Sequence, residues 1–304
     1  MDEKTEKLKQ TIKREYKSVR SFAKEVGIPH GTLVSALNNG IDSMAFGKVY
    51  QICRFLNLDP ETFEEKKKDT VSNIIQSNDA PKRNVEFCAS MMCANYGNLE
   101  KEIRDLEIAG IDSFHIDIMD GRYVPNFAMS LNDMAYIAGN TRLPLDVHLM
   151  IEHPSTHIDI FLRNLRKQDT VYIHPEAEYH PSTTLQKIID AGMIPGIAIN
   201  PGTSIENVME MLRIVDKVLV MSVNPGNAGQ MYLPYVGSKI EKLLSMQSEY
   251  GFELYWDGAC GEDKIKKFAP SGIKGFVLGT TVLFNQDKSY DECMKQIRGW
   301  VGEK

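Results

Sequence analysis

The sequence has no apolar run near the roughly 18 residues that a membrane-spanning helix needs, and its first residues are charged where a signal peptide would turn apolar. Its five cysteines are scattered without a Cys-x-x-Cys pair, which argues against a disulfide framework and favours a reducing compartment. Glycine, proline, apolar and charged contents are ordinary, which excludes collagenous, low-complexity and wholly disordered proteins. We therefore expect a soluble cytoplasmic protein without membrane contact and, from its 304 residues, about two domains.

Charge is distributed unevenly along the chain. The net charge is −6, but residues 1–56 carry ten Lys and Arg against six Asp and Glu, so that this segment is +4 and the remainder −10. A basic segment on an acidic body suggests an anionic partner for that segment, although ordinary variation in a helical surface would also explain it. A polar stretch of mixed charge that contains Pro81 follows. We predict two domains, 1–70 and 85–304, joined by a linker at 71–84.

Helical patterns dominate the first 63 residues. Apolar residues recur at helical spacing over 19–26, with Ser18 placed to cap this helix and Gly27 placed to end it. A second short helix is predicted over 32–37 and a third near 44–56. Two short helices joined by a glycine-containing turn are the geometry that places a recognition helix in the major groove of DNA. The segment therefore predicts a small all-α helix-turn-helix domain.

Residues 22–33 resemble the helix-turn-helix of the Cro and lambda-repressor family. Ala23 matches the position where the two helices cross closely, and Leu33 matches the inner face of the second helix. The resemblance implies DNA as a partner, with four residues facing base edges: His30, Gly31, Thr32 and Ser35. A helical bundle used for docking or dimerisation is the alternative, because the second helix has no Arg or Gln for bidentate base readout.

From residue 85 onward, short apolar runs alternate with longer amphipathic stretches. We predict eight strands, at 86–91, 114–118, 145–150, 170–174, 195–199, 217–222, 253–257 and 274–278. The helical segments predicted between them include 99–109, 156–166, 183–191, 205–212, 234–249 and 262–268. Eight strands each followed by a helix predict an α/β fold, a (β/α)8 TIM barrel. A doubly wound open sheet is the rival, but no G-x-G-x-x-G fingerprint follows the first strand.

Polar residues at the C-terminal ends of strands are typical of catalytic groups in such a barrel. The second strand carries His115 and Asp117 and the third carries Asp146 and His148, each pair spaced so that both side chains point to one face. The seventh strand ends at Asp257. Two histidines and two carboxylates from three strands would converge at one mouth, and such a set suits a divalent cation such as Zn²⁺, Fe²⁺ or Mn²⁺. Taken singly, each residue is better explained as a satisfied polar group of the core.

An ordered set of motifs between residues 86 and 285 resembles the ribulose-phosphate 3-epimerase family. These motifs are ASMM (89–92), FHIDIMDG (114–121), VPN (124–126), LDVHLM (145–150), VMSVNPGNAGQ (220–230) and DG (257–258). Three further stretches favour the allulose-6-phosphate 3-epimerase branch of the family, namely HPE (174–176), DGAC (257–260) and GTTVLFN (279–285).

The resemblance implies a role for individual residues. The family's metal ligands are matched by His115, Asp117, His148 and Asp257, which implies one divalent ion, Zn, Fe(II), Mn or Co. Asp117 and Asp257 also match its two acid/base carboxylates. The substrate contacts that the resemblance implies are Ser90, His148, Gly226, Asn227, Ala228, Gly229, Gly279 and Thr280.

The implied reaction is epimerisation at carbon 3 of a ketose phosphate. One carboxylate removes a proton from one face and the other returns a proton to the opposite face, through a metal-stabilised enediolate. The substrates would be ribulose 5-phosphate and xylulose 5-phosphate, or allulose 6-phosphate and fructose 6-phosphate, and we expect a homo-oligomer. The alternative is a transcription regulator whose barrel senses a sugar phosphate without turnover. Retention of all the ligands favours the enzyme.

Several residues depart from the family pattern or have no fixed role in it. Asn227 replaces the Phe usual in the phosphate loop, Arg122-Tyr123 replaces His-Phe, and Tyr255-Trp256 replaces Glu-Val. His174 ends the fourth predicted strand and is expected beside the ligand set. Four methionines near strand ends are expected to form a polarizable lining of the site, with plain core filling as the alternative: Met91, Met119, Met150 and Met221.

Overall fold

The structure is a computed structural model, and it describes residues 3–44, 46–56, 58, 62–64 and 85–303. Backbone contacts divide the chain into two compact units, Met1–Asp79 and Ala80–Lys304. The predicted linker at 71–84 lies outside the described residues. Among the described residues, no helix is long and apolar enough to cross a membrane.

The first unit is helical. It comprises α1 (Glu3–Glu15), α2 (Val19–Val26), α3 (His30–Asn39), the short 3-10 turn η1 (Ile41–Ser43) and α4 (Phe46–Phe55). The Ser18 side chain accepts a hydrogen bond from the Ser21 amide, and the Ser21 side chain accepts one from the Ser18 amide, which fixes the start of α2. Gly27 ends α2 in the left-handed conformation at φ 72°, where a side chain would be strained.

A small apolar core closes this helical unit. Its fully buried members come from all four helices and include Leu8, Phe22, Leu33 and Ile52. The buried Thr5 hydroxyl accepts a hydrogen bond of 2.8 Å from the Ile41 amide, which ties α1 to the start of η1. The predicted helices are therefore present, and α1 adds one that the sequence analysis did not delimit.

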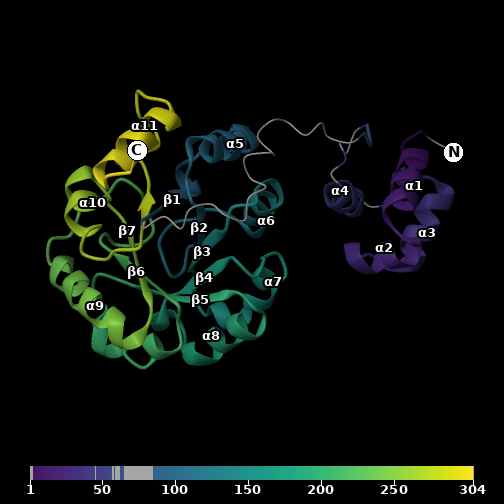
Figure 1. The fold of residues 1–304 in the computed structure, drawn as a ribbon. Helices are drawn as coiled ribbons and strands as arrows, with labels where there is room; N and C mark the ends of the chain where they lie inside the picture. The colour runs from purple at the N-terminus through teal and green to yellow at the C-terminus, as the bar shows by residue number, and fades with distance from the viewer. Residues whose placement is uncertain (1–2, 45, 57, 59–61, 65–84, 304) are drawn as a thin grey trace. The chain divides into compact units, whose positions relative to one another are not determined.

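The second unit is a closed barrel of eight parallel strands in chain order (Figure 1). The strands are β1 (Glu86–Ser90), β2 (Ser113–Met119), β3 (Leu145–Met150), β4 (Thr170–Ile173), β5 (Ile194–Ile199), β6 (Lys217–Met221), β7 (Glu253–Asp257) and β8 (Gly275–Leu278). Strand β1 pairs with both β2 and β8, so that no sheet edge is left open. The TIM barrel prediction is confirmed, and the doubly wound sheet is excluded.

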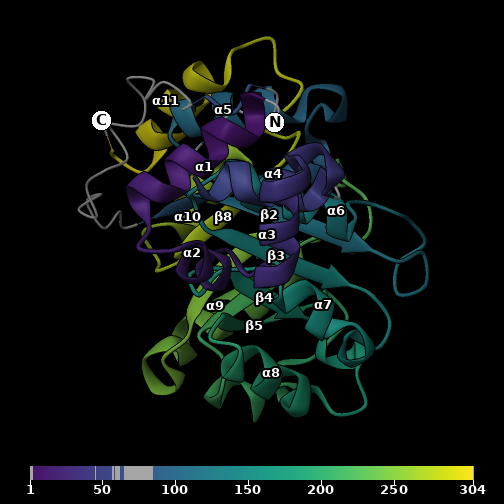
Figure 2. The same cartoon turned by 90° about the vertical axis from the view of Figure 1, so that its right-hand side faces the viewer.

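Helices surround the strands on the outside of the barrel (Figures 1 and 2). They are α5 (Leu99–Ala109), α6 (Leu131–Asn140), α7 (Ile158–Leu162), α8 (Pro181–Asp190), α9 (Val236–Tyr250), α10 (Glu262–Phe268) and α11 (Tyr290–Trp300). The capping serines Ser130 and Ser289 start α6 and α11. The helix predicted over 205–212 is wrong. Two 3-10 turns, η7 (Ile205–Asn207) and η8 (Met211–Arg213), replace it, because the backbone leaves helical geometry at Val208, where φ is −118°.

Successive side chains along a strand point alternately to the outer apolar core and to the interior of the barrel. On β1, Phe87 and Ala89 belong to the large apolar core that includes residues of the outer helices, whereas Cys88 belongs to a separate cluster with Tyr172 and Tyr255. That second cluster fills part of the barrel interior. The interior also holds the polar residues of β2 and β3, so the strands that carry the candidate site are buried on both faces.

Candidate active site

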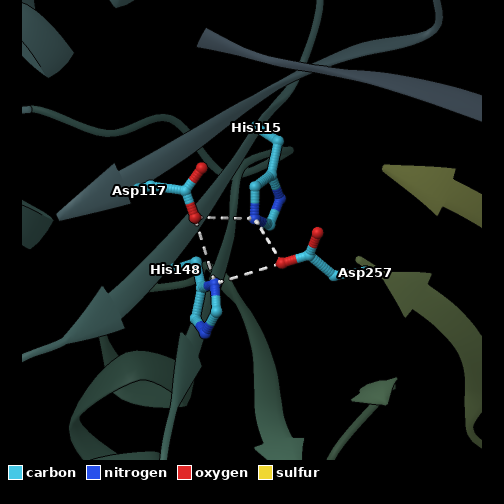
Figure 3. A group of neighbouring side chains, drawn as sticks. All are labelled: His115, Asp117, His148 and Asp257. Atoms are coloured by element: carbon cyan, nitrogen blue, oxygen red, sulfur yellow. Dashed lines mark hydrogen bonds and ion pairs between the residues drawn. The ribbon is translucent and has the colours of Figure 1, made fainter. Parts of the chain in front are cut away.

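Three strands bring four functional side chains together at the interior of the barrel (Figure 3). His115 and Asp117 lie two residues apart on β2, His148 lies on β3, and Asp257 is the last residue of β7. In the β2–β3 register, Asp117 is the direct neighbour of His148. Closure of the barrel brings β7 toward them, which an open sheet would not do.

The four residues form an alternating ring of nitrogen and oxygen atoms. The His148 Nδ1 atom lies 3.3 Å from Asp117 Oδ1 and 3.8 Å from Asp257 Oδ2. The His115 Nε2 atom lies 3.4 Å and 3.9 Å from the same two oxygens. One potential ligand atom from each residue lies within 4.8 Å of all the others. The side chains are almost fully buried, with Asp257 the most accessible at 17% exposure.

Burial and electrostatic interactions within the cluster shift the pKa values of these groups in different directions. Burial alone lowers the pKa of His115, but the Asp117 carboxylate, aided by Asp257, outweighs it and raises that pKa to about 9. Burial alone raises the pKa of Asp117, but His115 and His148 outweigh it and hold that pKa far below its usual range. The pKa of Asp257 is raised, chiefly by burial and further by Asp117, against the opposing effect of His115. Two neighbouring carboxyl groups with opposite shifts are suited to acid and base roles.

The donor set fits a divalent cation. Neither buried ring nitrogen of His115 makes a hydrogen bond to the residues that the structure describes, and Nε2 has only the longer contacts of 3.4 and 3.9 Å to Asp117 and Asp257. A buried imidazole without such partners is costly, and a cation between its Nε2 atom and the carboxylates would supply the missing interaction. Two imidazole nitrogens and two carboxylate oxygens are ligands that Zn²⁺, Fe²⁺ and Mn²⁺ accept.

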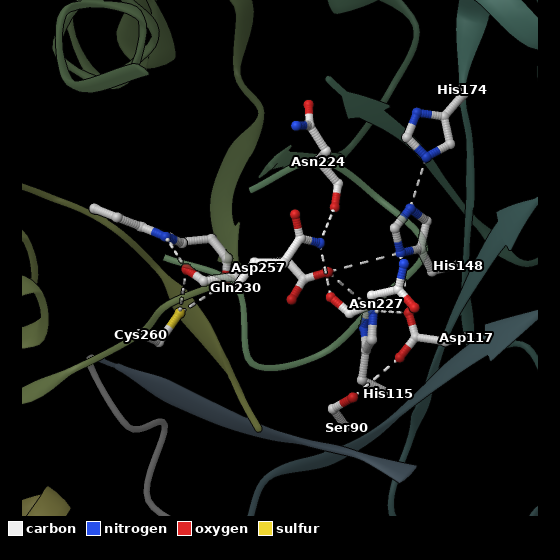
Figure 4. Close-up of polar contacts among 12 residues, drawn as sticks. Ser90, His115, Asp117, His148, His174, Asn224, Asn227, Gln230, Asp257 and Cys260 are labelled. Atoms are coloured by element: carbon white, nitrogen blue, oxygen red, sulfur yellow. Dashed lines mark hydrogen bonds and ion pairs between the residues drawn. The ribbon is translucent and has the colours of Figure 1, made fainter. Parts of the chain in front are cut away.

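Two further side chains contact this ring from opposite sides (Figure 4). The Ser90 hydroxyl at the end of β1 donates a hydrogen bond of 3.0 Å to Asp117 Oδ2. The His174 Nε2 atom lies 2.8 Å from His148 Nε2, on the side of that ring away from the cluster. The carboxylate of Asp117 and the ring of His148 are therefore each held by a second contact.

A pocket with about 550 Å³ of empty space opens above the cluster. Asp117, Asp257 and Ser90 line it, together with four methionines: Met92, Met119, Met150 and Met221. The expectation for Met91 is wrong. Strand β1 ends at Ser90 and the 3-10 turn η3 (Met91–Cys93) begins, so Met91 is buried in the outer core and Met92 faces the pocket.

The loops after β6 and β8 form another wall of this pocket. The predicted substrate contacts gather here, since the lining includes Gly226, Asn227, Ala228, Gly229, Gly279 and Thr280. The two loops are adjacent, because a Cβ built on Gly229 would lie 3.9 Å from Thr280 Oγ1. Positive φ angles of 113° at Gly226 and 77° at Gly229 allow the sharp course of the β6 loop.

Side-chain amides hold the β6 loop in place. Gln230 Nε2 donates to the carbonyl oxygens of Asn224 at 2.6 Å and Asn227 at 2.8 Å (Figure 4). Asn126, from the loop after β2, donates a hydrogen bond of 2.7 Å to the Gly226 carbonyl oxygen. Asn126 belongs to a matched motif, but its contact with the β6 loop is a relation between distant segments that the sequence does not reveal.

Asp146 does not join the cluster. Its carboxylate instead accepts a hydrogen bond of 2.6 Å from Ser113 and lies 3.2 Å from Lys217 Nζ. In the helical unit, His30, Gly31 and Ser35 are exposed on α3, whereas Thr32 is half-buried. Lys217 was not predicted as a functional residue, because its only signal is a charged residue at the start of a predicted strand.

Comparisons with known proteins agree with this geometry. The family model described as "Ribulose-phosphate 3 epimerase family" matches residues 86–283. The ribulose-phosphate 3-epimerase of Methanocaldococcus jannaschii is 34% identical over 208 residues, 67% of this chain and 86% of that protein. The enzyme of the same name from Bacillus subtilis is 33% identical, over 71% of this chain and 99% of that protein. The one from Helicobacter pylori is 35% identical, over 67% and 93%. This chain therefore belongs to the ribulose-phosphate 3-epimerase family and is an isomerase.

Proposed function

We propose that the chain is a metal-dependent 3-epimerase of a ketose phosphate. The observation that carries the proposal is the buried ring of His115, Asp117, His148 and Asp257 at the base of one pocket, with the pKa values of its two carboxyl groups shifted in opposite directions. The names of the relatives support a ribulose phosphate as the substrate.

The two carboxyl groups supply the proton transfers. Asp117, whose pKa is lowered, is ionised and removes the proton from carbon 3. The C–H electron pair forms the double bond between carbons 2 and 3, and the carbonyl electrons move to oxygen 2. Asp257, whose pKa is raised, returns a proton to the opposite face of carbon 3. In the reverse direction the two groups exchange roles.

The remaining residues of the pocket bind the substrate and stabilise charge. A divalent cation held by the four ring residues would supply positive charge for the oxygens of the enediolate. Ser90 holds the Asp117 carboxylate in orientation through its hydrogen bond. Backbone amides of the glycine-containing loops after β6 and β8 would bind the phosphate, as such loops commonly do in this fold. The methionine lining would give the reacting carbon an apolar wall.

The test is a proton-exchange assay on the full chain loaded in turn with Zn²⁺, Fe²⁺, Mn²⁺ and Co²⁺. We expect ribulose 5-phosphate to be converted to xylulose 5-phosphate in D₂O with deuterium incorporated at carbon 3. Asp117→Asn and Asp257→Asn should each lower the rate by at least about 10²-fold, the low end for a general acid or base. Glu152→Gln, which changes an exposed carboxylate of the loop after β3, is the control. Tight sugar-phosphate binding without deuterium incorporation would instead support a non-catalytic sensor.

The choice between five- and six-carbon substrates rests on the departures in the pocket wall. Asn227 offers a polar amide where an aromatic ring is usual, and it is exposed at the pocket. The stretches 174–176, 257–260 and 279–285 support allulose 6-phosphate as a second candidate substrate, and Asn227 is the departure at which we test the choice. Rates on both sugars, for the wild type and for Asn227→Phe, decide the question. If the amide favours the longer sugar, the variant should shift the ratio of rates toward ribulose 5-phosphate.

We infer a second function, DNA binding, for the helical unit. Helices α2 and α3 are joined by a turn that starts at Gly27, and the exposed face of α3 carries His30, Gly31 and Ser35, with Thr32 half-buried beside them. Arg20, Lys24 and His30 line one hollow beside this face, and residues 1–56 are +4. A basic surface next to a short exposed helix supports contacts with phosphates and base edges.

Titration of the full chain with fluorescent duplex DNA at low salt tests this function. Lys24→Glu should weaken binding and lower the salt slope by about one if Lys24 contacts a phosphate. Lys295→Glu, an exposed lysine of α11, is the control and should change neither quantity. Absence of binding at low salt would reject the proposal and leave docking or dimerisation as the role of the unit.

We also infer that 1–70 and 85–304 are separate domains joined by 71–84, and that the protein is a homo-oligomer. The division of backbone contacts near residue 79 supports the first inference. Limited proteolysis should cut first within 71–84 and leave two resistant fragments, and early cuts inside 85–304 would contradict it. Light scattering should give a mass above that of one chain.

A further inference from the structure

His174 is a buried residue whose position the proposed proton transfers leave unexplained. It follows β4 directly, is fully buried, and lies with its Nε2 atom 2.8 Å from His148 Nε2. We propose that His174 is a positioning residue that fixes His148 in the tautomer with its proton on Nε2, so that the His148 Nδ1 lone pair faces the metal site. The proposal rests on the metal-dependent function proposed above.

The two rings share one proton between their Nε2 atoms. Two imidazole nitrogens at hydrogen-bonding distance need one donor and one acceptor. If His148 donates from Nε2, its Nδ1 atom is free of a proton and points at Asp117 and Asp257, 3.3 and 3.8 Å away. If His174 donates instead, neutral His148 carries its proton on Nδ1 and cannot bind a cation there. Only the first arrangement makes Nδ1 a ligand.

The surroundings of His174 hold its ring in the position that this role requires. The Tyr123 ring packs against it with centroids 4.8 Å apart, and the His148 ring lies 4.9 Å away on a similar tilt. The Tyr123 hydroxyl accepts a hydrogen bond of 2.6 Å from Asn200, which also donates to Glu176 at 2.8 Å. Tyr123, held through Asn200 and Glu176 from the loops after β5 and β4, therefore restrains the ring.

The hydrogen-bonding pattern of His174 favours this role over plain packing. Its Nδ1 atom has no hydrogen-bonding partner among the residues that the structure describes, so His148 is the partner of its other nitrogen alone. An apolar side chain would fill the same space without leaving a buried polar atom unpaired. Among the described residues, the hydrogen bond that an imidazole makes at this position is the one to His148, a candidate metal ligand.

Two substitutions separate the hydrogen bond from the packing. His174→Gln keeps an acceptor where the Nε2 atom lies, whereas His174→Leu removes it and keeps the bulk. We expect His174→Leu to weaken Zn²⁺ and Co²⁺ binding about 10- to 100-fold in a chelator competition, the usual effect of losing such a partner, and His174→Gln to stay within a few-fold of wild type. His157→Leu, an exposed histidine, is the control. A purely structural role would lower the melting temperature of both variants without this split in affinity.

Nitrogen-15 NMR of histidine-labelled, Zn²⁺-loaded wild type tests the same point without relying on a variant that folds. We expect His148 to be protonated on Nε2 only and His174 on Nδ1 only. A proton on His174 Nε2, equal affinity of folded His174→Leu and wild type, or equal losses in the Leu and Gln variants would each overturn the inference. Absence of metal binding by the wild type would instead overturn the proposed metal site, so the two failures are distinguishable.

Discussion

Lys217 offers a sharp test of the forces inside the barrel, through the substitution Lys217→Met. The Lys217 Nζ atom lies 3.2 Å from Asp146 Oδ1, and the two side chains are 12% and 2% exposed. The ammonium group also lies 4.4 Å from the centre of the Tyr255 ring. Methionine has a similar length, so the substitution removes the charge and leaves little cavity.

The expected loss follows from leaving Asp146 buried without its cation. Removal of one partner from a buried ion pair costs about 3–5 kcal/mol, because the remaining charge is uncompensated. The Ser113 hydroxyl still donates to Asp146 Oδ2 at 2.6 Å, which places the expected loss at the low end, about 3 kcal/mol. For a domain of this size that corresponds to a melting temperature lower by roughly 6–12 °C.

Thermal unfolding followed by circular dichroism measures the effect, and a double variant checks its cause. Adding Asp146→Asn to Lys217→Met removes the unpaired charge and keeps an oxygen for Ser113, so it should restore most of the lost stability. The reasoning is refuted if Lys217→Met lowers the melting temperature by less than about 2 °C, or if the double variant is no more stable than the single one.

The pH dependence of the stability is an independent test of the ion pair between Asp146 and Lys217. Burial alone raises the pKa of Asp146, but Lys217 outweighs it and lowers that pKa, while Asp146 likewise raises the pKa of Lys217 against burial. The Asp146 contribution is therefore fully present above its unfolded pKa of about 3.9 and is lost as pH falls through the lower folded value. The Lys217 contribution is present below about 10.4 and is lost as pH rises through the higher folded value. The stability difference between wild type and Lys217→Met should shrink in acid, and a difference that stays constant below pH 4 would contradict this assignment.

Three further predictions concern the metal, a glycine of the site and a helix cap. Chelator treatment of metal-loaded protein should lower the melting temperature, since binding at 1,000 times Kd stabilises by about 4 kcal/mol; unchanged melting in calorimetry would contradict the metal site. Gly258→Ala should lower epimerase activity more than tenfold, because φ is 92° and the new Cβ would lie 2.5 Å from Val223 Cγ2, whereas Gly202→Ala, with open space around it, should have no effect. Ser18→Ala should destabilise α2 by about 1 kcal/mol, measured as faster amide hydrogen exchange confined to that helix, and unchanged exchange would show that the cap contributes nothing.

The strands were predictable because the central residues of each are buried on both faces. Such strands appear as continuous apolar runs bounded by turn residues, and β3 and β7 have the bounds that the sequence predicts. The segment after β5 was not predictable. Ile205, Val208 and Leu212 are all buried at spacings of three and four, which suit an α-helix as well as the two 3-10 turns that the structure shows.

The residues of the site could be predicted from the sequence, but how far along the barrel axis each side chain lies could not. Period-two alternation puts Asp146 and His148 on one face of β3, and Asp146 is even the register partner of His115. The stagger between tilted strands decides how far along the barrel each side chain reaches, and a single sequence does not contain that stagger. Met91 and Met92 show the same limit, because alternation ends where β1 gives way to a 3-10 turn at a residue that no local pattern marks.

Lys217 explains how the interior tolerates Asp146 so close to the cluster. Asp117, Asp257 and Asp146 all contribute to the raised pKa of His115, so the three carboxylates act on one region of the barrel. Without an internal cation, Asp146 would add an uncompensated buried negative charge beside the cluster. The ammonium group of Lys217 neutralises it locally, which leaves the attraction of Asp117 and Asp257 directed at the space between the two imidazoles. The Lys217–Asp146 ion pair and the ring of candidate ligands therefore lie in one charged region of the barrel. Lys217, at the start of β6, pairs with Asp146 and so separates the charge of Asp146 from that of the ring.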